Sequence, residues 1–308
     1  MAVAMAVTMA TAWFHNAGSI WQLWALVISL QKPGSLSKMG DGISPELKAQ
    51  TAASLVLLAP PQEVEDVVKA VRTIVGDCKP FEKNLRKVLL QYAKEQTVQV
   101  ALPGCPVKTL ITEQGDLQNG RFLCPRTHNS FTFDPLTFAV DDVSPTAPND
   151  KEGGSVELEP WRRAIEDMLT TYIAEKFPTG AVSVFAPSSE KPMIYIYIEG
   201  NIRKQFSSGR WRSSWVIEFP KNYKGSSLNV TGDVKVQTHI FEQGNVQLMS
   251  SKKNAFEVTA TSPEAFAADV AAKIAEFDTE YQFDFLYGYD CWDMRVEDEG
   301  LLEDRLSS

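Results

Sequence analysis

The sequence predicts an α+β fold in which a helical N-terminal region precedes an antiparallel sheet. Three observations predict it. Apolar residues recur every three or four positions in the first third, strand-like runs with period two follow one another between residues 181 and 249, and a long apolar helical stripe comes after them. Because short turn-forming segments separate the strand-like runs, they indicate an antiparallel meander of about five strands rather than a parallel sheet.

The first third, which we assign as residues 39–100, is predicted to form an antiparallel helical stalk. Ser44-Pro45-Glu46 is a helix-start signal, and Pro60-Pro61 ends the helix that it begins. A second helix is predicted from Glu63 to Val75 and a third from Phe81 to Gln96, each with apolar residues at helical spacing.

Two less regular segments follow the stalk. Residues 101–140 contain closely spaced Gly and Asn turn signals between short apolar runs, which predicts a region of short strands. Residues 141–159 are rich in Asp, Pro, Gly and Ser, which is typical of a mobile linker.

Residues 160–282 are predicted to form a helix, the central sheet and a long second helix. Pro160–Phe177 has an apolar stripe at helical spacing, and Ser262 can cap a helix whose stripe runs from Phe266 to Tyr281. Between them lie the strand-like runs, at residues 181–185, 193–198, 211–219, 234–241 and 246–249. The stripes predict that both helices pack on the sheet.

The run GRWRSSW, residues 209–215, separates its side chains into two faces. Trp211 and Trp215 lie on one face, and Arg210 and Arg212 lie on the other. We expect the tryptophans to be core or dimer-interface residues and the arginines to pair with carboxylates at the rim.

The next strand and its turn complete this set of candidate residues. His239 and Phe241 share a face of the strand, and Gly244 and Asn245 belong to the polar turn that follows it. A histidine within a strand predicts a structural role, so we assign all of these residues to the core or to a subunit interface.

The motifs of an enzyme are missing. The three histidines have no Cys or His neighbour at metal-ligand spacing, and no Gly-rich nucleotide-binding motif follows a strand. The four cysteines form no C-x-x-C pair, so we expect no metal site, redox pair or disulfide framework; they are Cys78, Cys105, Cys124 and Cys291. We therefore predict no catalytic residue, no metal and no cofactor.

A nucleic-acid-binding sheet is the alternative function. Arg203, Lys204, Arg210 and Arg212 are interleaved with aromatic residues, which is a pattern that can bind phosphates and stack on bases; the aromatic residues are Phe206, Trp211 and Trp215. The formal net charge of −9 argues against it, because nucleic-acid binders usually have a basic footprint.

Three segments, in the same order and at similar separations, resemble one known family. LITEQGDLQNGRFLCPR, F-x-x-G-R-W-R-S and HIFEQGNVQL, which span residues 110–126, 206–213 and 239–248, are similar to signature segments of the F-actin-capping protein alpha subunit. The similarity extends more weakly from Ser44 to Gln282.

The resemblance implies a heterodimer with a structurally similar beta subunit, in which the two sheets join into one and each chain contributes a helical stalk. Such a dimer caps the barbed end of the actin filament, in the cytoplasm and at the actin cytoskeleton, with no bound nucleotide or metal. A partner strand would also cover the edge of the sheet, which is otherwise prone to aggregation. The partners implied are the beta subunit and the filament end, not nucleic acid.

The C-terminus departs from the family. The resemblance implies a basic tentacle that docks onto actin, but residues 276–308 contain eleven acidic residues and two arginines, so this segment accounts for the whole formal net charge of −9. We assign residues 283–308 to an acidic tail, and no residue of this chain matches the tentacle. A frameshift or retained intron, a lineage-specific isoform and a diverged regulator are the alternatives. For a genuine tail we expect dimerisation with weak capping, because acidic surfaces repel.

The N-terminus departs as well. The first 31 residues have no formal charge and are rich in Trp, Leu and Ile, which suggests a membrane span or signal segment, yet polar residues interrupt the stretch. MGDGISPELKAQ, which begins at Met39, resembles a family start. We therefore interpret residues 1–38 as a hydrophobic extension of the gene model; peptides upstream of Met39 in mass spectrometry of the native protein would contradict this.

Overall fold

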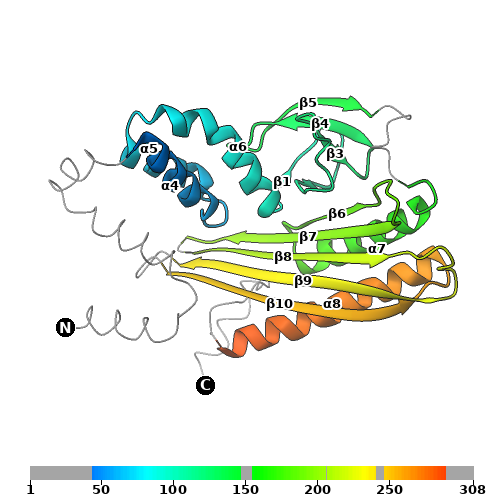
Figure 1. Ribbon diagram of the computed structural model, residues 1–308. Helices are drawn as coiled ribbons and strands as arrows, with labels where there is room; N and C mark the ends of the chain where they lie inside the picture. The colour runs from blue at the N-terminus through cyan, green and yellow to red at the C-terminus, as the bar shows by residue number, and fades with distance from the viewer. Residues whose placement is uncertain (1–43, 147–154, 206, 241–245, 289–308) are drawn as a thin grey trace, which may run out of the picture.

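The computed structural model describes residues 44–146, 155–205, 207–240 and 246–288 (Figure 1). The helices are α4 (Pro45–Leu57), α5 (Val64–Val75), α6 (Lys79–Glu95), α7 (Glu159–Lys176) and α8 (Pro263–Gly288). The strands are β1 (Gln99–Val100), β2 (Thr109–Leu110), β3 (Phe122–Cys124), β4 (Asn129–Phe133), β5 (Val140–Pro145), β6 (Ala181–Phe185), β7 (Met193–Arg203), β8 (Ser207–Glu218), β9 (Ser227–Ile240) and β10 (Val246–Thr259).

Helices α4, α5 and α6 form the helical region that the sequence predicts. The Ser44 hydroxyl accepts a hydrogen bond from the Leu47 amide at 3.2 Å, so Ser44 caps α4 as expected. The apolar sides of these helices share one core with β3 and β4, in which Phe81, Tyr92 and Phe131 are buried. This core is separate from the core of the central sheet.

The central sheet is a five-stranded antiparallel meander with the strand order β10-β9-β8-β7-β6. Each strand pairs with its neighbour in sequence, which confirms the predicted topology. Strands β7 to β10 have 11 to 14 residues and β6 has only five, so the two edges of the sheet differ in length.

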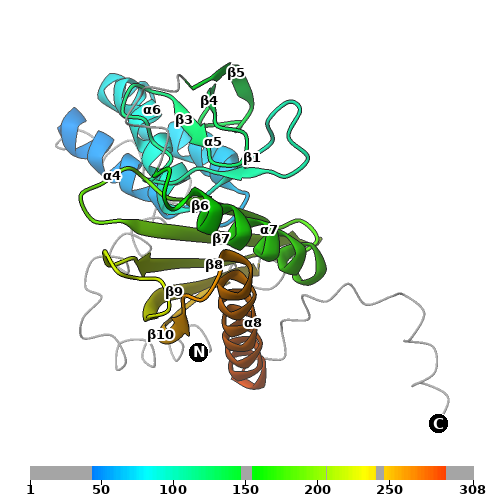
Figure 2. The same cartoon turned by 90° about the vertical axis from the view of Figure 1, so that its right-hand side faces the viewer.

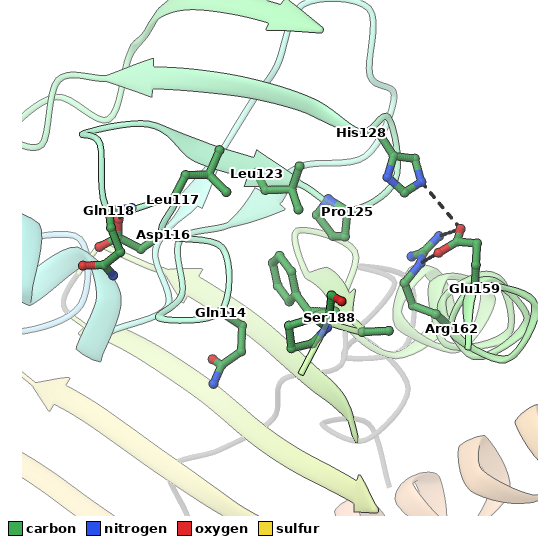
Figure 3. Close-up of a pocket in the computed structure, with 13 residues that line it drawn as sticks. Gln114, Asp116, Leu117, Gln118, Leu123, Pro125, His128, Glu159, Arg162 and Ser188 are labelled. Carbon is green, nitrogen blue, oxygen red and sulfur yellow. Dashed lines mark hydrogen bonds and ion pairs between the residues drawn. The ribbon is translucent and has the colours of Figure 1, made fainter. Parts of the chain in front are cut away.

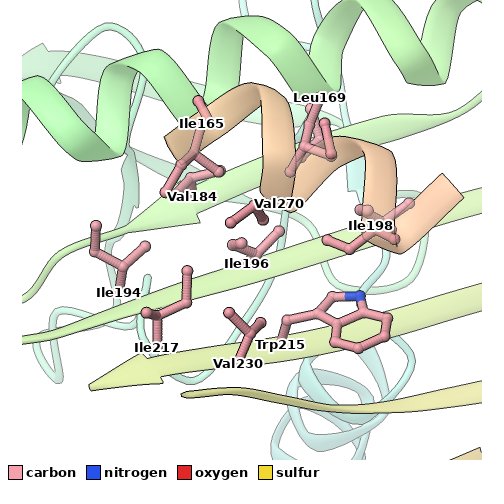
Figure 4. Packing of buried hydrophobic residues seen from close by; sticks show 14 of the residues in the cluster. Ile165, Leu169, Val184, Ile194, Ile196, Ile198, Trp215, Ile217, Val230 and Val270 are labelled. Atoms are coloured by element: carbon pink, nitrogen blue, oxygen red, sulfur yellow. The ribbon is translucent and has the colours of Figure 1, made fainter. Parts of the chain in front are cut away.

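Helices α7 and α8 cover one face of this sheet (Figure 2). Ile165 and Leu169 of α7 and Val270 of α8 pack on buried branched residues of the strands, among them Ile196 and Val230 (Figure 4). None of these five side chains is accessible to solvent. Ser262 caps α8, since its hydroxyl accepts a hydrogen bond from the Ala265 amide at 3.2 Å.

A three-stranded sheet, β3-β4-β5, lies beside α6. Its third strand occupies Val140–Pro145, so the prediction of a linker from residue 141 is wrong for the first five residues of that segment. Asp142 is fixed there by an ion pair with Arg121 at 2.6 Å, and the strand pairs with β4. The amino-acid composition of residues 141–145 does not predict this strand, because the residues that pair with it, in β4, and its ion-pair partner Arg121 belong to other segments.

A buried carboxylate links the two helices on the sheet. Asp278 of α8 is inaccessible to solvent, and it accepts a hydrogen bond from the Tyr172 hydroxyl of α7 at 2.9 Å. Its second oxygen has no hydrogen-bond partner in the structure. Burial raises the pKa of Asp278 to about 7, against the weaker lowering effects of Tyr172 and Lys176.

We predict that the stability of the Asp278→Asn variant will depend less on pH than the stability of the wild-type protein. Between about pH 4 and pH 7 the unfolded chain releases the Asp278 proton and the folded chain keeps it, so stability falls as the pH rises, by about 4 kcal/mol in all. Asparagine cannot ionise, so the variant should have the higher melting temperature at pH 8, and the gap should close toward pH 4. Asp269→Asn, on an exposed site of α8, is the matched control and should leave the profile unchanged. A parallel profile for Asp278→Asn would contradict the prediction.

Candidate functional site

Trp211 and Trp215 lie in the core between the central sheet and its helices. Their exposures are 1% and 0%, and Trp215 packs edge-on against Phe277 of α8 with ring centroids 5.8 Å apart. Each tryptophan is directly opposite a glycine on a neighbouring strand, Gly200 for Trp211 and Gly232 for Trp215. A Cβ atom at Gly232 would collide with the Trp215 indole, and one at Gly200 would collide with the Phe177 ring, which stacks on Trp211. Both tryptophans therefore belong to the core of this chain.

The opposite face of the sheet contains a buried ion pair. Arg210 of β8 and Glu199 of β7 have exposures of 4% and 1%, and the Arg210 Nε atom lies 3.0 Å from the Glu199 carboxylate. Arg210 also donates a hydrogen bond to the Gln96 side chain at 3.2 Å, just beyond the end of α6. Gln99 of β1 donates to the same carboxylate. The helical region therefore covers this face of β8 at Arg210, whereas Arg212 stays partly exposed.

Arg212, two residues along β8, adds a second cation to this cluster. It donates a hydrogen bond to the Glu95 carbonyl at the end of α6. Burial, with repulsion from Arg210, lowers the pKa of Arg212 to about 10, so the guanidinium stays charged at neutral pH. Burial raises the pKa of Glu199, and Arg210 opposes that rise. One carboxylate thus balances two partly or fully buried arginines.

His239 of β9 is held by the segment between α4 and α5. Its Nδ1 atom lies 2.7 Å from the Glu63 carboxylate, which also accepts a hydrogen bond from the Ser208 hydroxyl at 2.9 Å. Next to it, Gln62 donates to Asn201 at 3.1 Å. Gln62 has a φ of 63°, so the chain turns sharply where it meets the sheet. His239 therefore links β9 to the segment between α4 and α5.

These contacts form one polar seam between the helical region and the sheet, which we define as Glu63, Gln96, Gln99, Glu199, Arg210, Arg212 and His239. Arg210 pairs with a carboxylate, as predicted, but it does so in the interior and not at the rim. Arg212 binds a backbone carbonyl instead. Segments from the first third of the chain cover this face. The seam fixes the orientation of the helical region on the sheet.

Two of the aromatic residues of the nucleic-acid alternative are not placed for base stacking. Base stacking needs exposed aromatic rings, but Trp211 and Trp215 are buried. Of the four cations in that pattern, Arg210 is buried against Glu199, whereas Arg203 and Lys204 are exposed. Phe206 lies outside the described residues, as do Phe241, Gly244 and Asn245.

A cavity of about 220 Å³ lies between the three-stranded region and the start of α7 (Figure 3). Its charged residues all have charged neighbours: His128 lies 3.5 Å from Glu159, Glu159 binds Arg162 at 2.7 Å, and Asp116 lies 3.1 Å from Lys94. No nucleophile is paired with a free base among the residues that line it. In the part of the chain that the structure describes, no three His, Cys, Asp or Glu side chains are placed to hold a metal ion.

The same part of the chain contains no helix that is both long and apolar enough to cross a membrane. The hydrophobic extension predicted at residues 1–38 lies outside it.

Comparison with known proteins is decisive. The model of the F-actin capping protein alpha subunit family matches residues 52–291. The chain belongs to this family. It is 32% identical to the F-actin-capping protein subunit alpha of Caenorhabditis elegans, over 78% of this chain and 83% of that protein. It is also 32% identical to the Dictyostelium discoideum protein of the same name, over 72% of this chain and 76% of that protein.

A solved structure shows the same fold. The homodimeric actin capping protein alpha subunit from Plasmodium berghei superposes with a TM-score of 0.65 at 20% identity, and covers 77% of this chain and 90% of that chain. At this identity the likeness concerns the fold alone. The capping protein match reaches residue 291, beyond the residue 282 at which we expected the similarity to end, so part of the acidic segment lies within the matched region.

Several residues of the seam in this capping protein family member escaped prediction. The sequence patterns did not predict Glu63, Gln96, Gln99 or Glu199 as site residues. Three of them bind a predicted residue: Glu63 binds His239, and Gln96 and Glu199 bind Arg210. Gln99 binds Glu199. A signal for Glu199 was present, because it is the one acidic residue in the otherwise apolar run MIYIYIEG. Nothing local marks the other three.

Proposed function

We propose that this chain is the alpha subunit of a heterodimeric capping protein, and that its beta partner pairs with strand β10. The exposed edge of that strand supports the proposal. β10 has 14 residues and hydrogen-bonds only to β9 among the described strands, and Val246 and Met249 on it are 49% and 66% exposed. A long edge with exposed apolar residues is an aggregation hazard unless another strand covers it.

The other edge of the sheet is less suited to a partner. β6 has five residues, and its Ser183 hydroxyl accepts a hydrogen bond from the Leu110 amide of β2 at 3.0 Å. The segment that contains β2 therefore packs against β6. This difference leaves β10 as the edge at which a second sheet can continue the first.

Charge favours a different chain over a second copy as the partner. A two-fold axis through the middle of β10 brings Lys252 and Lys253 of one copy close to the same lysines of the other. Like charges directly opposite one another destabilise an antiparallel pair. A beta subunit without lysines at these positions avoids the repulsion.

We predict that Met249→Asp will prevent assembly with the beta subunit. Co-expression with beta should keep the wild-type chain soluble and yield a heterodimer on size-exclusion chromatography, because the partner strand covers the β10 edge. A carboxylate at Met249 would be buried in the new pair and should abolish the complex. Val156→Asp is the matched control, since Val156 is 90% exposed and far from the sheet edge in sequence. A normal yield of the Met249→Asp heterodimer would rule out β10 as the joining edge.

The expected activity is barbed-end capping in the cytoplasm, at the actin cytoskeleton. The formal charge of −9 over residues 276–308 favours a second candidate, a subunit that dimerises and regulates without capping strongly. We predict that the co-purified heterodimer will slow pyrene-actin elongation from seeds only weakly. Neutralising the acidic residues of 292–308, outside the family match, should strengthen the block. A nanomolar block by the unaltered chain would exclude the second candidate.

A further inference from the structure

A second cavity, of about 260 Å³, lies between the end of α6 and the face of the central sheet that α7 and α8 leave open. Strands β7, β8 and β9 contribute to its wall, and Arg212 and Ser214 lie on the same face of β8. Its charged lining residues are three cations, Lys94, Arg212 and Lys235, and three carboxylates, Glu95, Glu113 and Asp233. What the cavity can bind therefore depends on which of these charges are already paired.

The two lysines have carboxylate partners. The Lys94 ammonium lies 2.9 Å from Glu113 and 3.1 Å from Asp116. The Lys235 ammonium lies 3.2 Å from Asp233. Neither lysine therefore brings an unpaired positive charge to the cavity.

Arg212 differs from both lysines. Within the described part of the chain it forms no ion pair with a carboxylate, and its Nη1 atom donates to the Glu95 carbonyl. The Glu95 carboxylate accepts a hydrogen bond from the Gln91 side chain at 2.8 Å instead, and Glu199 is paired with Arg210. The lowered pKa of Arg212 agrees with this arrangement, because burial and repulsion from Arg210 outweigh the attraction of the carboxylates around it. The cavity thus contains a charged guanidinium without a counterion.

The size of the cavity limits the ligand. Its volume of about 260 Å³ is several times the roughly 30 Å³ that one water occupies in the liquid, so an ion of the size of phosphate fits together with waters. Pockets for drug-sized ligands have about 300–1,000 Å³, so a nucleotide is too large. A guanidinium in a cavity of this size favours a small inorganic anion.

We propose that this cavity binds a small tetrahedral oxyanion, phosphate or sulfate, on the guanidinium of Arg212. Two oxygens of the anion accept parallel hydrogen bonds from Nε and Nη2, the edge of the guanidinium that Glu95 does not use. In the structure Nε is buried without a hydrogen-bond partner, so the anion supplies an acceptor that the folded chain does not. The hydroxyl of Thr97, which also lines the cavity and has no partner, is a further donor there.

A bound oxyanion also strengthens the contact between the helical region and the sheet. Arg212 joins β8 to the end of α6 through the Glu95 carbonyl, and its positive charge is poorly compensated in the folded chain. An anion that binds only the folded protein raises its stability by mass action. Phosphate or sulfate should therefore raise the melting temperature in a saturable manner, and chloride at the same ionic strength should not.

Phosphorus NMR of inorganic phosphate tests the proposal on the full-length chain with its co-purified partner. The site lies within this chain, so the result does not depend on which partner that is. At constant ionic strength we expect the phosphate line to broaden as protein is added, with a dissociation constant on the order of 1 mM, and sulfate to reverse the broadening. No broadening, or an equal reversal by chloride, would overturn the proposal.

Two variants locate the bound ion. Arg212→Gln removes the cation and should abolish the broadening. Ser214→Leu fills the cavity and keeps the cation, so it should also prevent binding, and it decides the matter alone if Arg212→Gln does not fold. Arg163→Gln is the matched control on α7, where the Arg163 side chain is 66% exposed, and should bind phosphate like the wild type. Wild-type binding by either cavity variant, or loss of binding in the control, contradicts a site at Arg212.

Discussion

Replacing Arg210 with methionine should destabilise the protein by about 3–5 kcal/mol, because the change leaves a buried carboxylate without its cation. Glu199 is 1% exposed, and the Arg210 guanidinium at 3.0 Å is its ion-pair partner. A typical domain has only about 5–15 kcal/mol of stability, so the effect should be plain in urea denaturation of the co-purified heterodimer.

A pH profile gives this variant a distinct signature. Burial already raises the pKa of Glu199, and the loss of Arg210 removes the main opposing effect, so the pKa rises further. A folded-state pKa above the unfolded value means that stability falls as the pH rises from the unfolded pKa toward the folded one. The variant should therefore lose most at neutral pH and recover in part at pH 5.

Two controls test whether the ion pair is the cause. Adding Glu199→Gln to Arg210→Met should restore part of the stability, since both charges are then absent from the interior. Lys235→Met, on the same sheet, removes an exposed lysine that lies 3.2 Å from Asp233 and should cost at most about 1 kcal/mol. Equal losses for Arg210→Met and Lys235→Met would show that Arg210 contributes no more than a surface charge.

Hydrophobic periodicity predicted the helices and strands of this fold, because residues a few positions apart on one face of an element are buried together. The stripes of α7 and α8 and the alternation in β8 place Trp211 and Trp215 correctly on the helix-covered face. The same alternation says that Arg210 and Arg212 share a face, but it does not say what covers that face. The covering residues lie 100 to 176 positions away, as the contacts of Gln99 with Glu199 and of Glu63 with His239 show.

The GRWRSSW motif, residues 209–215, therefore contributes to the fold in two ways. Its tryptophans fill the core of the sheet, and its arginines attach the helical region to the other face. Trp211, Trp215 and Arg210 are buried, and Arg212 is partly exposed. The motif accordingly describes how the sheet is packed on both of its faces.

Gly232→Ala should be about as disruptive as the loss of the ion pair, although it adds only one methyl group. A Cβ atom at Gly232 would lie 2.1 Å from Cε3 and 2.4 Å from Cδ2 of Trp215, far inside contact distance. The indole cannot move away easily, because it is fully buried and packs on Phe256 and Phe277 with centroids 5.5 and 5.8 Å away. Overpacking of this kind costs about 3 kcal/mol, and β8 must separate from β9 to relieve it.

The measurement is the urea midpoint of the heterodimer. The decisive comparison is with a double variant in which a second substitution relieves the clash. Thr231→Ala, at an exposed position next to Gly232, should change stability by no more than about 0.5 kcal/mol. Adding Trp215→Phe to Gly232→Ala should recover part of the loss, since the smaller ring vacates the space that the new methyl needs, whereas Trp215→Phe alone should destabilise by leaving a cavity. If the two changes simply add, the glycine is required for a reason other than the room it leaves for Trp215.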